Sequence, residues 1–217
     1  MFEALSYSND TEKSEFEKYR KIRGKFVLNQ IYEYLLNFNY EKVKYSELST
    51  CIRYDKNLRD TLYIYLATFE EYLRAIILDK YDLESHFKLN RKEERYIEKM
   101  ADSMYESKNK ENSELYAKFS LDLGETISLV SKLKMFSDEK LEEFENIRFL
   151  RNNVMHHNLI VLGKEISLEK VAKNKEKMEK GIVALANNLP GGYRQNFINA
   201  INSLRCDFEQ YKMIIEA

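Results

Sequence analysis

The chain contains almost nothing that interrupts a helix. Its 217 residues include one proline and six glycines, while Lys, Glu, Leu, Ile and Tyr are abundant. Proline and glycine most often end helices and form turns, so their scarcity favours helices over a sheet with many turns. The sequence therefore predicts an all-α fold. Its length suits one domain with a proper core, and we expect residues 1–217 to form a single helical domain.

Apolar periodicity divides this domain into expected elements. Residues 1–10 lack periodicity and are expected to form a loose tail, and residues 40–54 a connecting helix and loop. Residues 88–113 are rich in charge, which is typical either of a solvated face or of an insertion that touches RNA or a partner. Helical spacing predicts helices at residues 11–38, 55–80, 115–136, 137–161, 167–187 and 191–215.

The net charge limits the possible binding partners, and the cysteines indicate the cellular compartment. The formal net charge is −1, so no global basic field indicates nucleic acid, and any contact with RNA must be local. No apolar run is long enough to span a membrane, and no apolar leader is evident, so we expect a cytoplasmic protein. Cys51 and Cys206 are expected to be thiols that fill apolar space. The histidines and cysteines lack zinc-site spacing, so we expect no metal and no cofactor.

One helix carries most of the chemistry-bearing residues. Arg151 stands beside an apolar stripe, and a guanidinium near buried surface needs a partner such as a carboxylate or a phosphate. Asn152, His156 and His157 follow within six residues. Histidine can exchange a proton near neutrality and arginine can hold a phosphate, so the set suits phosphodiester chemistry. The alternative is a polar helix end with solvated histidines. The stripe comprises Phe144, Ile147, Leu150, Val154 and Val161.

A second helix carries a charged pair. Glu70 and Arg74 are four residues apart inside the apolar stretch 55–80, the spacing of a salt bridge on a helix surface. An exposed pair of this kind contributes only a few tenths of a kcal/mol, about 0.3–0.5. On spacing alone it is a surface feature.

The order Arg151-Asn152-x-x-x-His156 resembles the R-x(4–6)-H motif of HEPN domains. These are all-helical modules of prokaryotic toxins, abortive-infection proteins and the RNA-cleaving effectors of type VI CRISPR systems. The pattern Phe69-Glu70-x-x-x-Arg74 resembles the helix that precedes the catalytic helix in Abi-like HEPN proteins. A third segment is similar to the family's C-terminal helix, with Leu189-Pro190 followed by Arg194 and Phe197. The resemblance covers roughly residues 15 to 215 and implies a HEPN-like bundle with additional helices.

The resemblance implies metal-independent cleavage of RNA, in which the ribose 2′-OH attacks its own phosphate and leaves a 2′,3′-cyclic phosphate. His156 would act as general acid or base, Arg151 would stabilise phosphoryl charge, and Asn152 would orient one of them. His157 is the alternative to His156. Glu70, with Arg74, is implied to reach the catalytic helix and to fix Arg151 or a histidine.

The implied assembly is a homodimer. Residues five apart on a straight helix point about 140° away from each other, so one chain does not complete the site, whereas a two-fold dimer brings two motifs face to face. A toxin or phage-defence effector of this kind also implies an antitoxin or a small regulatory RNA as partner. Two other hypotheses stay open: a non-catalytic HEPN-like module that binds RNA, nucleotide or antitoxin, and a helical scaffold with a fortuitous motif.

Overall fold

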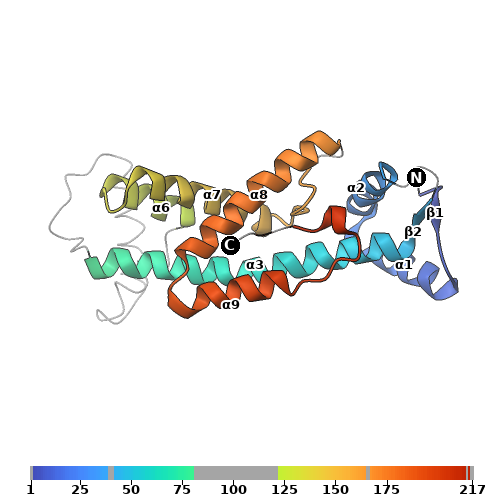
Figure 1. The fold of residues 1–217 in the computed structure, drawn as a ribbon, viewed down its shortest axis with the longest axis horizontal. Coiled ribbons are helices and arrows are strands. Elements are labelled where there is room, and N and C mark those ends of the chain that lie inside the picture. Colours follow the sequence, from blue (N-terminus) through green and yellow to red (C-terminus); the bar gives the residue numbers. More distant parts are fainter. Residues whose placement is uncertain (1, 39–41, 81–121, 165–166, 214, 216–217) are drawn as a thin grey trace.

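One long helix, α3 (Tyr45–Lys80), forms the axis of the structure and runs along much of its length (Figure 1). The computed structural model describes residues 2–38, 42–80, 122–164, 167–213 and 215, without the side chains of residues 77–80. The expected insertion at residues 88–113 lies outside this part of the chain. The described residues are predominantly helical, which confirms the all-α class.

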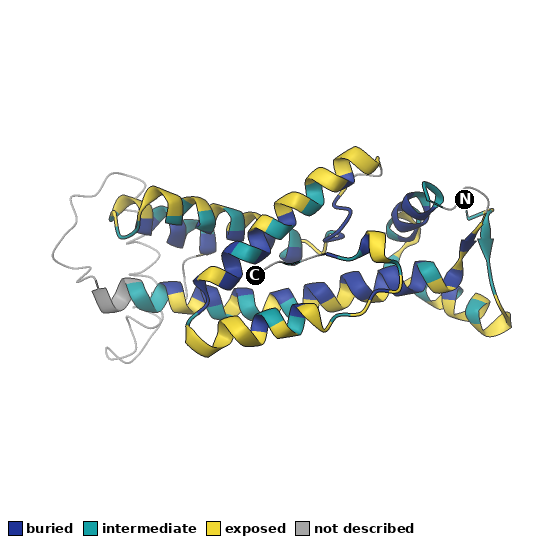
Figure 2. Ribbon diagram, viewed as in Figure 1, coloured by how far each residue is buried: buried dark blue, intermediate teal, exposed yellow. Residues whose placement is uncertain are grey.

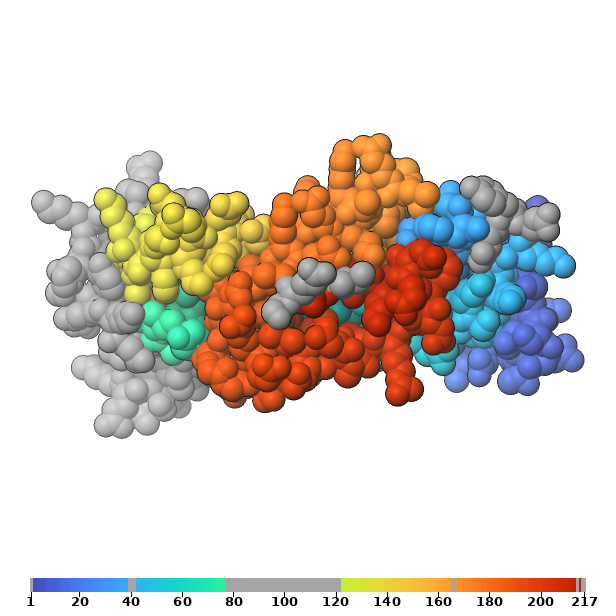
Figure 3. Space-filling model, in the orientation of Figure 1, coloured from blue at the N-terminus to red at the C-terminus, as the bar shows by residue number. Residues whose placement is uncertain are grey.

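The other helices are arranged around α3. Helices α1 (Asp10–Arg23) and α2 (Lys25–Leu36) lie at one end, and α6 (Leu123–Lys132) and α7 (Asp138–Met155) pack along the other half (Figure 1). Helix α8 (Leu168–Asn188) packs on α7, and α9 (Gly191–Asn202) lies along α3 and α8. The space-filling view shows α8, α9 and the C-terminal segment covering the middle of α3 on this face (Figure 3).

The core lies where α3, α7 and α8 meet, and buried residues follow these contact faces (Figure 2). Phe69 of α3 packs edge-on against Phe144 of α7, with ring centroids 5.5 Å apart. Gly181 allows α8 to approach α7 closely, because a Cβ there would lie 2.9 Å from the Cβ of Leu150 and 3.0 Å from the carbonyl oxygen of Asn146. Any larger side chain would push the two helices apart.

The N-terminal residues differ from the expected loose tail. Strand β1 (Leu5–Ser6) pairs in parallel with β2 (Val43–Lys44), and Phe2 packs edge-on against Phe16 and Tyr32. The single helix expected at residues 11–38 is also wrong. Gly24 has a φ of +79°, a conformation that costs glycine little, so the chain turns there and forms α1 and α2 separately.

Three further boundaries differ from prediction. The expected connection at residues 40–54 is mostly helix, because α3 begins at Tyr45. The helix expected at residues 115–136 ends at Lys132, and its described part, α6, begins at Leu123 after a capping box formed by Asp122 and Glu125. The C-terminal helix ends at Asn202, and the chain continues irregularly to a short 3₁₀ helix, Glu209–Tyr211.

This C-terminal segment docks on the first half of α3. The backbone N–H of Met213 donates to the hydroxyl of Tyr54 at 2.9 Å, and Thr50 exchanges hydrogen bonds with Asp207. Cys51 and Cys206 are buried free thiols, as expected, but they lie beside each other. A hydrogen bond between the two thiols lowers the pKa of Cys206 and raises that of Cys51.

Candidate functional site

Helix α7 begins where the sequence predicts. The hydroxyl of Ser137 accepts a hydrogen bond from the backbone N–H of Lys140 at 3.4 Å, and Asp138 and Glu139 occupy the first turn, near the positive end of the helix dipole. Its apolar face, Phe144, Ile147, Leu150 and Val154, is buried. The helix runs antiparallel to α3, since Arg151 contacts Glu70 while Ile160 contacts Asp55.

Glu70 joins two arginines at the contact between α3 and α7. Its Oε1 accepts a hydrogen bond from Nε of Arg151 at 3.0 Å, and its Oε2 lies 3.4 Å from Nη2 of Arg74. The Glu70 side chain is 11% exposed and that of Arg151 is 28% exposed. The expected contact between Glu70 and Arg151 is therefore confirmed. Among the described residues, Arg151 bonds to Glu70 through Nε, and no protein group in this part of the chain bonds to its Nη groups.

The two histidines do not lie on the helix. Helix α7 ends at Met155, and His156 is the residue that caps it, with its backbone N–H bonded to the carbonyl of Asn152. His157 has a φ of +54°, the left-handed conformation that ends a helix. Both imidazoles are exposed, as is the side chain of Asn152. The prediction that this helix continues through Val161 is wrong.

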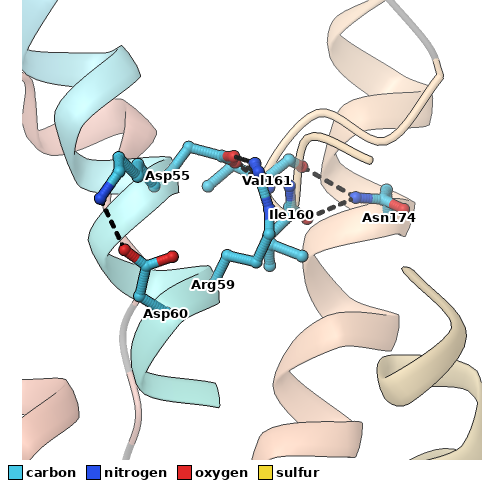
Figure 4. Close-up of polar contacts among 7 residues, drawn as sticks. Asp55, Arg59, Asp60, Ile160, Val161 and Asn174 are labelled. Atoms are coloured by element: carbon cyan, nitrogen blue, oxygen red, sulfur yellow. Dashed lines mark hydrogen bonds and ion pairs between the residues drawn. The ribbon is translucent and has the colours of Figure 1, made fainter. Parts of the chain in front are cut away.

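Side-chain hydrogen bonds from other helices explain the early end of α7. Oδ1 of Asp55, on α3, accepts from the backbone N–H groups of Ile160 at 2.7 Å and Val161 at 3.4 Å (Figure 4). Nδ2 of Asn174, on α8, donates to the carbonyl oxygens of the same two residues. These bonds satisfy backbone groups that a helix would otherwise pair internally. Residues 156–163 thus form a fixed turn held between α3 and α8.

Asp55 is the electrostatic centre of this turn. Its side chain is 1% exposed, and its Oδ2 lies 2.6 Å from Nη2 of Arg59. Burial raises the pKa of Asp55, while Arg59 and the backbone N–H groups oppose that rise. Asp55, Arg59 and Asn174 were not among the residues predicted from the sequence. An indication was present for the first two, because they stand four residues apart in register with the buried Leu62 and Leu66.

The remaining predicted residues lie on α9 and near the end of α7. Arg194 is exposed on α9, whereas Phe197 is buried and packs against Tyr65. Asn153, which was not among the predicted site residues, forms more contacts than Asn152: its Nδ2 donates to the carbonyl of Phe149, and its Oδ1 accepts from Asn158. The structure thus brings Glu70, Arg74 and Arg151 together, with His156 and His157 in the turn that follows.

Among the described residues, no group of three or more His, Cys, Asp or Glu side chains is arranged to hold a metal ion. No helix in the same part of the chain combines the length and apolarity needed to cross a membrane.

Comparison with known proteins yields no match: no protein-family model, no curated protein and no solved structure is similar to the chain.

Proposed function

We propose that the protein is a metal-independent endoribonuclease of the HEPN type. The observation that carries the proposal is the contact between Glu70 and Arg151. It joins the two segments whose sequences resemble HEPN motifs, 81 residues apart in the chain, through the two residues that the resemblance singles out. In the cell, such an enzyme acts in the cytoplasm as a toxin or abortive-infection effector, restrained by an antitoxin or a small regulatory RNA.

Glu70 prepares Arg151 for a phosphate. By accepting from Nε, the carboxylate fixes the plane of the guanidinium and leaves both Nη groups available to two phosphoryl oxygens. The side chain is partly exposed, so a phosphate can reach it, and partly buried, so the interaction is screened less than one on open surface. Arg151 stabilises the charge that develops on the phosphoryl oxygens as the ribose 2′-OH attacks phosphorus.

His156 carries the proton transfer in this proposal. As the base it takes the proton of the 2′-OH; as the acid it gives a proton to the departing 5′-oxygen, and the products are a 2′,3′-cyclic phosphate and a 5′-hydroxyl. Its position in the cap leaves the imidazole exposed, and the turn behind it is fixed by Asp55 and Asn174. Asn152, one turn before, orients the phosphate or the imidazole in this proposal.

We further propose that two copies of the chain form the complete site across a two-fold axis. One histidine then serves as base and its counterpart as acid, and two arginines concentrate positive charge in a chain whose net charge is −1.

The experiment is cleavage of single-stranded RNA in the presence of EDTA, with identification of the product ends. We expect cyclic phosphate ends from wild type and a loss of about 100-fold or more in His156→Ala, because general acid–base catalysis contributes about 10²–10⁴. His157→Ala, which changes an equally exposed imidazole at the next position, should lose far less.

Three outcomes separate the alternatives. Cutting that survives His156→Ala but fails in His157→Ala moves the acid–base role to His157. Cutting that stops in EDTA and returns with a divalent ion contradicts the metal-independent reaction. RNA binding without any cutting, in a protein whose overexpression does not slow growth, favours the non-catalytic binding module.

A further inference from the structure

A pocket of about 280 Å³ lies in the groove between α3 and the end of α7. Val154, which is buried, and Met155, which is half-buried, supply its apolar wall, whereas Tyr63 is 54% exposed. The volume is at the lower end of small-molecule sites, so it suits one ring system. The pocket is lined by Arg59, Asp60, Tyr63, Val154, Met155 and His157.

The polar groups of the pocket are of two kinds. Arg59 is 7% exposed and donates through Nη2 to Asp55, while its buried Nε–H has no hydrogen-bond partner in the described structure. Because Arg59 lines the pocket and a guanidinium only donates hydrogen bonds, an occupant that carries acceptors is favoured here. Asp60 is exposed, and its Oδ2 binds Nζ of Lys56 at 2.7 Å. Its other oxygen can accept from a ligand.

The pocket is close to the proposed catalytic residues. Tyr63 and Glu70 are seven residues apart on α3, which corresponds to two turns on the same face and about 10 Å along the axis. Val154 and Met155 follow Arg151 by three and four residues. A nucleic acid strand whose phosphate binds Arg151 can therefore place a neighbouring base in the pocket.

We propose that this pocket binds a guanine base and selects the nucleotide beside the cleaved phosphate. A base of single-stranded RNA can stack on the Tyr63 ring above the apolar wall, as unpaired bases do on aromatic side chains. Guanine offers acceptors, O6 and N7, to Arg59, and donors, N1–H and N2–H₂, to the carboxylate of Asp60. Adenine presents a donor where guanine has O6, and it would face the guanidinium of Arg59. The inference rests on the proposed ribonuclease function for its substrate, RNA. Its test measures nucleotide binding and does not require cleavage.

The test is nucleotide binding measured calorimetrically with GMP, AMP, CMP and UMP. We expect GMP to bind about tenfold more tightly than AMP, the discrimination expected of one well-placed pair of hydrogen bonds. Tyr63→Ala should weaken all four nucleotides by about tenfold, because it removes the stacking ring. Asp60→Asn should reduce the GMP preference while it leaves AMP binding nearly unchanged. The matched control is Tyr72→Ala, which removes an exposed tyrosine elsewhere on α3.

The results distinguish this inference from the ribonuclease proposal. Equal affinities for the four nucleotides, or no saturable binding of any, overturn the inference, as does an effect of Tyr72→Ala as large as that of Tyr63→Ala. If RNA is cut in EDTA but without preference for guanine next to the cut, the inference fails and the ribonuclease stands. If GMP binds through Tyr63 and Asp60 but no RNA is cut, the pocket stands and the ribonuclease proposal fails.

Discussion

Helix α3 carries two carboxylates that are built into similar surroundings but differ in what they can do. Asp55 and Glu70 each have an arginine four residues later, Arg59 and Arg74, and each also bonds to the α7 segment. Asp55 bonds to two backbone N–H groups of the turn after α7, whereas Glu70 bonds to the side chain of Arg151. The two clusters therefore have the same arrangement, in which a carboxylate of α3 joins an arginine of α3 to a group of the α7 segment.

The difference lies in burial and in the kind of partner. The side chains of Asp55 and Arg59 are 1% and 9% exposed, and Asp55 also accepts from two backbone N–H groups. Glu70 and Arg151 are 11% and 28% exposed, and among the described residues no protein group bonds to the Nη groups of Arg151. A buried carboxylate with backbone partners holds a structure in place, while a partly exposed arginine can exchange or add a ligand. We therefore assign the stability of the turn to Asp55 and the phosphodiester chemistry to the Glu70–Arg151 cluster.

The largest effect on stability should come from Asp55→Asn. The neutral amide cannot form an ion pair with Arg59, so a buried guanidinium loses its charged partner. We expect a loss of about 3 kcal/mol in the free energy of unfolding. Urea denaturation measures it. Asp60→Asn, five residues later and exposed, is the control and should cost less than about 1 kcal/mol. Equal losses in the two variants would show that the Asp55 cluster does not hold the turn.

Asn174→Ala tests the other side of the same turn. Removal of Nδ2 leaves the carbonyls of Ile160 and Val161 without their α8 donor, and we expect a loss of about 2 kcal/mol. Gly163→Ala should act similarly, because Gly163 has a φ of +65° and a Cβ there would lie 2.8 Å from Oδ1 of Asn174. Thermal unfolding followed by circular dichroism would detect both. A neutral result for both variants would mean that the turn is held without α8.

Glu70→Gln should have a smaller effect on stability and a large one on activity. The Glu70 carboxylate is buried, but Arg151 is 28% exposed and the amide oxygen of Gln can still accept from it, so we expect a loss of about 1–2 kcal/mol in unfolding experiments. If Glu70 orients Arg151, cleavage of RNA should fall while the protein stays folded. Cleavage at the wild-type rate in this variant would show that Glu70 does not orient Arg151.

The smallest effect is expected from Arg148→Ala. Arg148 lies one turn before Arg151 on α7 and pairs with Glu145 at 2.6 Å, with both side chains about half exposed. Such pairs contribute about 0.5 kcal/mol or less, so stability and RNA cleavage should both stay near the wild-type values. A marked loss of cleavage would show that the helix needs positive charge in general rather than Arg151.

Local features of the sequence predicted part of this picture. Ser137 caps α7 because a cap depends on residues three positions apart, and Glu70 meets Arg151 because both stand at the edges of apolar stripes that must pack together. The end of α7 could not be predicted, because it depends on a contact between distant parts of the sequence. Val161 continues the helical spacing, but its N–H is captured by Asp55, 106 residues earlier, and no local pattern records that contact.

The same limit explains the errors at the two ends of the chain. Leu5 pairs with Val43, and Cys206 meets Cys51, through contacts between segments that are far apart in the sequence. Periodicity detects a buried face but does not identify what covers it. For that reason the all-α class and the helix carrying Arg151 were predictable, whereas the turn that positions His156 was not.

The most direct test of the account is Arg151→Ala, with the RNA cleavage rate in EDTA and the free energy of unfolding measured on the same preparation. We expect cleavage to fall by about 100-fold or more, because Arg151 stabilises the phosphoryl charge, while stability changes by about 1 kcal/mol or less. Arg148→Ala should change neither. Cleavage that persists in Arg151→Ala, or a stability loss as large as that of Asp55→Asn, would contradict the assignment of chemistry to the Glu70–Arg151 cluster.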